Sequence, residues 1–138
     1  MPFAPILDVI SPQMMLVTCG LGIAALFLLT LVIALVEGVV LTLLKWNPFL
    51  RALLIAALMN ILSSLAGAVL LVFLQDTPII WLVIGFLLSV VIEGGVMTRF
   101  PPRLGWRTWL FAFIANLASY LLLILPAYLY SLADAIAP

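Results

Sequence analysis

Long runs of apolar residues dominate the chain, and short clusters of polar residues separate them. Residues 14–36, 52–74 and 108–132 form three such runs, and none of them contains a charged residue. A membrane-spanning helix needs about 20 predominantly apolar residues, and each run exceeds that length. The three runs therefore predict three transmembrane helices.

A fourth run, residues 78–92, is interrupted early by Glu93. As a helix, a run of about 15 residues extends about 22 Å, which is less than the roughly 30 Å of a bilayer's hydrocarbon core. The span is complete only if the helix continues past Glu93 to Arg99. This pattern predicts a fourth transmembrane helix, beginning near Pro78, with Glu93 inside the membrane.

The polar residues also reveal an internal repeat. Residues 37–65, shifted by 56 positions, align with residues 93–121 without gaps, and ten of 29 positions are identical. Six of the ten are Glu, Gly, Thr, Arg, Asn and Ser, types that are scarce in this chain. The identical pairs are Glu37/Glu93, Gly38/Gly94, Val40/Val96, Thr42/Thr98, Arg51/Arg107, Leu54/Leu110, Ala56/Ala112, Asn60/Asn116, Ser63/Ser119 and Leu65/Leu121.

The repeat predicts the fold class. We expect an all-α integral membrane protein with one membrane domain over residues 1–138. Its four transmembrane helices form two tandem helical hairpins, about residues 22–75 and 78–131, in a compact bundle. Two hairpins of the same orientation should be related by a pseudo-twofold axis along the membrane normal, as in parallel-repeat transporters.

The charged residues predict an orientation. All five basic residues flank two turns, whereas Asp8, Asp76 and Asp134 fall on the opposite side. The basic residues are Lys45, Arg51, Arg99, Arg103 and Arg107. The positive-inside rule places both basic turns in the cytoplasm. Both termini then face outward, in the plasma membrane or, in a cyanobacterium, the thylakoid membrane.

Composition narrows the partners and the chemistry. Only 7% of the residues are charged and 68% are hydrophobic, against about 25% charged in a soluble domain, so the chain's solvent is expected to be the lipid bilayer. With a net charge of zero and no basic face apparent, a nucleic-acid partner is not expected. Histidine is absent and Cys19 is the only cysteine. We therefore expect no cofactor, no metal centre and no enzyme activity.

The polar residues inside the spans form a candidate site. Glu37 precedes the turn near Trp46 by about nine residues, and Asn60 follows it by about fourteen, so their backbones differ in depth by roughly 7 Å. Helix side chains lean toward their own N-terminus, and the two should therefore meet, with Arg51 also able to reach Glu37. Applied to both repeats, this gives a candidate intramembrane site of Glu37, Asn60, Arg51, Ser63, Glu93, Asn116, Arg107 and Ser119.

Two interpretations of this site are open. In the first, Glu37 and Glu93 are neutralised by arginine or by a proton and cement the hairpins by hydrogen bonds. In the second, the Glu/Asn pairs form a site for an ion, a proton or a lipid headgroup. The first interpretation favours a structural or accessory subunit that packs with other membrane proteins or forms a homo-oligomer. The second favours a small transporter or channel subunit.

The stretch from Glu37 to Gly67 resembles a known family. Glu37 near the end of one span, the basic turn with Arg51, and Asn60, Ser63, Ser64 and Gly67 on the next helix are similar to the membrane part of the cyanobacterial filament-integrity proteins of the FraC family. A second, looser copy lies at residues 93–119. The resemblance implies a non-enzymatic membrane protein at cell–cell septa.

Overall fold

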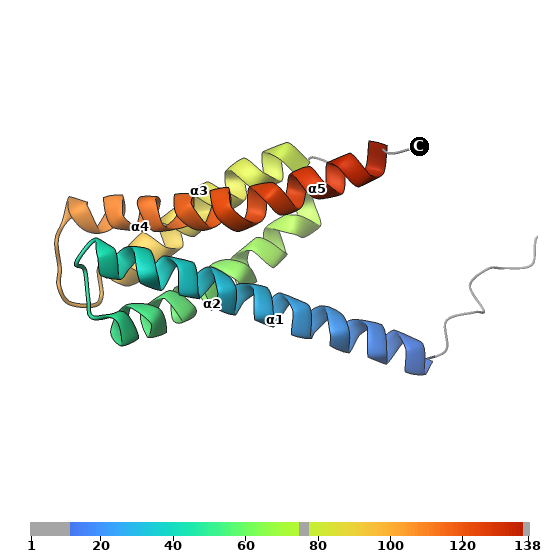
Figure 1. Ribbon diagram of the computed structural model, residues 1–138, viewed down its shortest axis with the longest axis horizontal. Helices are drawn as coiled ribbons and strands as arrows, with labels where there is room; N and C mark the ends of the chain where they lie inside the picture. The colour runs from blue at the N-terminus through green and yellow to red at the C-terminus, as the bar shows by residue number, and fades with distance from the viewer. Residues whose placement is uncertain (1–11, 75–77, 137–138) are drawn as a thin grey trace, which may run out of the picture.

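The described part of the protein is entirely helical. The computed structural model describes residues 12–74 and 78–136, and its elements are shown in Figure 1. Three helices, α1 (Pro12–Leu43), α2 (Phe49–Leu74) and α3 (Pro78–Met97), precede a last continuous rod. That rod consists of α4 (Trp106–Ser119), the π-helical turn η2 (Tyr120–Ile124) and α5 (Leu125–Ile136). The predicted all-α fold class is confirmed for these residues.

Three segments are long and apolar enough to cross a membrane, namely Gly22–Leu43, Phe49–Val69 and Trp106–Tyr130. The apolar part of α3, Leu82–Met97, is shorter. α3 nevertheless continues past Glu93 to Met97 and contains 20 residues. The helix thus includes Glu93, as the sequence predicts, and Arg99 lies in the turn that follows. These helices identify a membrane protein.

The helices pack in a ring in which α1 contacts α2 and α4, and α3 contacts the same two helices. Both interhelical turns, α1–α2 and α3–α4, lie at one end of the molecule, and the helices diverge toward the other end (Figure 1). Asp8 and Asp76, on which the predicted orientation also depends, lie outside the described residues. The buried core is concentrated in the half nearer the turns. Its apolar members are Ala34, Leu41, Trp46, Ala52, Ile55, Ala56, Met59, Met97, Ala112 and Ala115.

Two glycines allow the helices of each hairpin to approach closely. A Cβ atom at Gly38 would lie 3.0 Å from the Cα atom of Leu53, and one at Gly94 would overlap the Trp109 ring. Gly38 and Gly94 occupy equivalent positions of the two repeat units, and so do Leu53 and Trp109. Each glycine directly follows a glutamate, so the close approach brings that glutamate within reach of the next helix.

Candidate functional site

Two buried glutamates face each other inside the ring. Glu37 of α1 and Glu93 of α3 are each only 1% exposed, and their carboxyl groups lie within hydrogen-bonding reach of one another. The two carboxyl groups thus form a facing pair in the interior of the ring.

An asparagine from the same hairpin binds each carboxyl group. Asn60 donates from Nδ2 to Oε2 of Glu37 at 2.5 Å, and Asn116 donates to Oε2 of Glu93 at 2.7 Å. Each amide also donates to the carbonyl oxygen four residues earlier in its own helix, at 3.0 Å. Both hydrogens of each amide are thus engaged, and the orientation of each asparagine is set.

A serine from the opposite hairpin donates a hydrogen bond to the second oxygen of each carboxyl group. Ser119 of α4 donates to Oε1 of Glu37 at 2.8 Å, and Ser63 of α2 donates to Oε1 of Glu93 at 3.2 Å. Each glutamate therefore accepts one hydrogen bond from the asparagine amide of its own hairpin and one from the serine hydroxyl of the other hairpin. Sequence reasoning placed both serines in the site but did not foresee that each one would bind the glutamate of the other hairpin, an arrangement that we call the exchange of serines.

The structure does not bring Arg51 and Arg107 into the cluster. Both side chains are exposed, and neither forms an ion pair with a glutamate among the residues that the structure describes. The guanidinium carbon Cζ of Arg107 lies 6.0 Å from the centre of the Trp106 ring instead. Each arginine is in the first turn of its helix, next to the interhelical turns, where a long side chain extends outward to water. The expected arginine contact to Glu37 is therefore not found.

A cavity of about 320 Å³ extends from the cluster between the diverging helices. Glu37, Asn60 and Asn116 line it at the cluster end. Small side chains of the first repeat unit line it farther along, at Thr30, Ser64, Gly67 and Ala68. The equivalent positions of the second unit hold the larger Phe86, Tyr120, Leu123 and Ile124. Gly85, Ser89, Tyr120 and Ile124 also line the cavity, so both hairpins contribute to its wall.

Tyr120 contributes an aromatic side chain to the wall of the cavity. Its hydroxyl group hydrogen-bonds with Ser89 of α3, and it lies 3.3 Å from the place of a Cβ atom at Gly85. Its ring packs edge-on against Phe86, with centroids 5.1 Å apart. The first unit has Ser64 at the matching position, so no ring closes the cavity from that side.

Comparison with known proteins provides no relative for this site. No family model, curated protein or solved structure matches the chain. Within residues 12–74 and 78–136, no group of three or more histidine, cysteine, aspartate or glutamate side chains could hold a metal ion. The class of protein defined here is a helical membrane protein with a buried glutamate–asparagine–serine cluster.

Proposed function

We propose that this protein is a small polytopic membrane subunit with a structural or accessory role. It would consist of four transmembrane helices arranged as two tandem hairpins, about residues 22–75 and 78–131, in a compact bundle. The contacts support this duplication, because they recur at equivalent positions of the two units: the glutamate–asparagine bond, the asparagine's bond to its own helix, and the glycine's close approach to the next helix. Its 20 residues give α3 a length of about 30 Å, which suits a fourth span.

The observation that carries the structural role is the exchange of serines between the hairpins. All four carboxyl oxygens are hydrogen-bonded, and the bonds join every helix of the ring. Polar groups satisfied in the interior hold membrane helices together, and many large apolar side chains are exposed along the outer sides of the described helices. The described turns, residues 44–48 and 98–105, are too short to form a soluble active site. Such a surface suits lateral packing against other membrane proteins or further copies of this chain.

A native pull-down tests this role. The tagged chain, extracted from its own membrane in a mild detergent, is expected to run as a defined complex of constant stoichiometry by native mass spectrometry. The E37Q/E93Q variant should form the same complex, because glutamine retains the shape and an acceptor oxygen. A chain that is monomeric and alone after extraction in several mild detergents would contradict an accessory role.

We expect the protein to lie in the plasma membrane, or in the thylakoid membrane if it comes from a cyanobacterium, with the basic turns facing the cytoplasm.

The cavity favours a second candidate, a small transporter or channel subunit that uses the paired glutamate–asparagine sites. In liposomes containing the purified chain, proton and potassium fluxes are followed with a pH-sensitive dye and a potassium-selective dye. A transport role predicts that E37Q/E93Q abolishes flux while the protein remains folded. It also predicts that S64Y, which introduces the residue type found at the matching position of the second unit, reduces flux by filling the cavity. No flux from the unmodified chain in either assay would contradict this candidate.

A further inference from the structure

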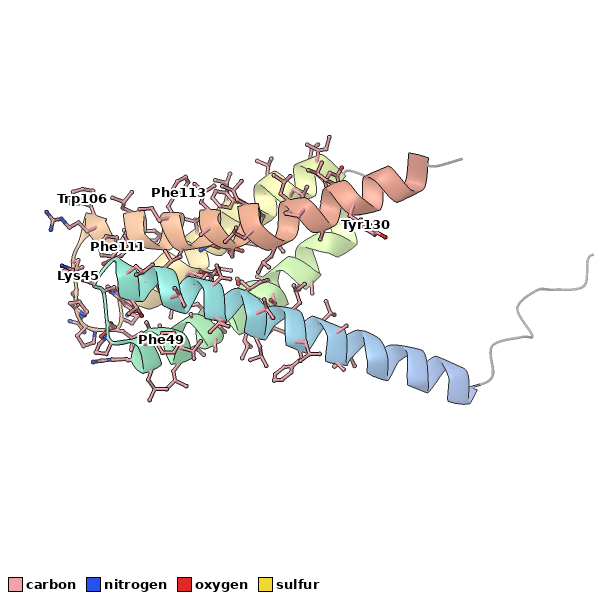
Figure 2. All side chains as sticks on the ribbon, viewed as in Figure 1. Lys45, Phe49, Trp106, Phe111, Phe113 and Tyr130 are labelled. Atoms are coloured by element: carbon pink, nitrogen blue, oxygen red, sulfur yellow. The ribbon has the colours of Figure 1, made fainter. Side chains whose placement is uncertain are left out.

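The fold brings the two basic turns together into one basic face. The side chains of Lys45, Arg51, Arg99, Arg103 and Arg107 are all exposed. They come from the two turns and the helix starts beside them, and the turns are joined by a hydrogen bond of 2.9 Å from Nδ2 of Asn47 to the carbonyl oxygen of Pro101. Lys45 and Trp106 accordingly lie at the same end of the molecule (Figure 2). We call these five cationic side chains the basic face.

The positive charge of the basic face is not compensated within the described part of the chain. None of its five side chains forms an ion pair there, and the two glutamates nearest to it in sequence, Glu37 and Glu93, are buried and bonded to asparagine and serine. Five exposed cations at one end therefore present a positive field to whatever lies beyond it.

Apolar side chains are interleaved with these cations. Leu43 is 75% exposed, Leu50 is 68% exposed and Phe49 is also exposed, on either side of Lys45 and in the same turn region as Arg51. Trp106, which is 70% exposed, lies beside Arg107. Exposed leucine and phenylalanine belong in hydrocarbon, whereas tryptophan is enriched at the level of lipid headgroups. The basic face is therefore positioned at the boundary of a leaflet rather than free in water.

We propose that the basic face binds the phosphate groups of anionic phospholipids in the leaflet next to the two turns. A guanidinium group matches phosphate geometry by paired hydrogen bonds, and four of the five cations are arginines. The partner is a lipid and not a soluble polyanion, because the apolar residues between the cations need an acyl-chain environment at the same place. This interaction is independent of the role proposed for the glutamate cluster.

Lipid retention tests this proposal directly. The full chain is reconstituted in vesicles of equal parts phosphatidylglycerol and phosphatidylcholine, extracted gently, and analysed by native mass spectrometry for the lipids it keeps. The unmodified chain is expected to retain phosphatidylglycerol in preference, and less of it at high salt, because salt screens the attraction. Since each basic residue near an anionic surface contributes about 1 kcal/mol, or about fivefold in affinity, R51Q/R103Q should lose most of this preference.

The charge-conserving R51K/R103K variant is the matched control, and it should keep more of the preference for phosphatidylglycerol than R51Q/R103Q, because lysine retains the charge but not the paired hydrogen bonds. Thermal unfolding of both variants in phosphatidylcholine alone confirms that they fold. Equal retention of the two lipids by the unmodified chain would overturn the proposal. Preferential binding of a soluble polyanion, tested with a short RNA competing against phosphatidylglycerol vesicles, would also overturn it.

Discussion

Replacing Gly94 with valine is expected to destabilise the protein by about 3 kcal/mol, at the upper end of overpacking costs, whereas the same change at the neighbouring Gly95 should be nearly neutral. A Cβ atom at Gly94 would overlap the Trp109 ring, but one at Gly95 would meet nothing within 4 Å. The overlap would also separate α3 from α4 and lengthen the bond between Asn116 and Glu93. Both effects act in the same direction.

The free energy of unfolding of the two valine variants is measured by denaturant titration in mixed micelles. Gly95 provides a close control, because it is the next residue of the same helix. The change from glycine to valine alters helix propensity by the same amount at both positions. Gly38→Val should reproduce the loss seen at Gly94, because its Cβ atom would meet the backbone of Leu53 at 3.0 Å. Equal stabilities of the Gly94 and Gly95 variants would show that α3 and α4 are not in close contact at this point.

The second large effect is expected from Glu37→Leu, which should destabilise the protein by about 2 kcal/mol, the size expected for two interhelical hydrogen bonds in a membrane. The bonds that the change removes come from Asn60 and from Ser119. Measured interhelical bonds average about 0.6 kcal/mol and reach about 1.7 kcal/mol, and both of these bonds are buried. The loss is limited because Ser119 can still donate to the carbonyl oxygen of Asn116, at 3.0 Å.

Glu37→Gln is the matched control for the leucine variant. Glutamine has the same size and accepts from Asn60 through its carbonyl oxygen. Its amide can donate to the hydroxyl oxygen of Ser119, which then donates its own proton to the carbonyl oxygen of Asn116. Its unfolding free energy should lie within about 0.5 kcal/mol of the unmodified chain, because bonds of the same kind are retained. A glutamine variant as unstable as the leucine variant would show that the carboxyl group itself is indispensable for folding.

Sequence reasoning anticipated the elements and half of the cluster. Apolar run lengths predicted the helices, and the short run before Glu93 predicted that α3 continues past it. The pairing of Glu37 with Asn60 followed from helix rise and side-chain direction alone, because both residues belong to one hairpin. Local geometry constrains residues on adjacent, directly connected helices, so this part of the site could be predicted without knowledge of the tertiary fold.

The contacts between the hairpins could not be predicted in the same way. The bond from Ser119 to Glu37 spans 82 residues, and it depends on α4 lying next to α1, which no local pattern specifies. Arg51 is exposed and makes no contact with Glu37 among the described residues. Sequence reasoning could not decide this, because a long side chain in the first turn can either reach inward or extend to the interface. The small residues Ser64 and Gly67 were visible in the sequence, but the cavity that they line follows only once the helices are placed around it.

The hydrogen bonds from each serine to the glutamate of the other hairpin have a structural consequence for the two hairpins. A single hairpin supplies the asparagine for its own glutamate but leaves the second carboxyl oxygen without its donor. When two hairpins pack together, each supplies the serine that hydrogen-bonds to the other's glutamate, and the facing carboxyl groups lie between the hairpins. Each half of the site is thus incomplete without the other, which ties the stability of the protein to the interface between its hairpins.

A double-mutant cycle between Glu37 and Ser119 tests this interlocking most directly. Unfolding free energies are measured for the unmodified chain, for E37L, for S119A and for the double variant, and the cycle with S63A in place of S119A serves as the control. Because Ser119 bonds to Glu37 whereas Ser63 bonds to Glu93, the account predicts a coupling of about 1 kcal/mol for Glu37 with Ser119 and a clearly smaller one for Glu37 with Ser63. Zero coupling between Glu37 and Ser119 would contradict the account.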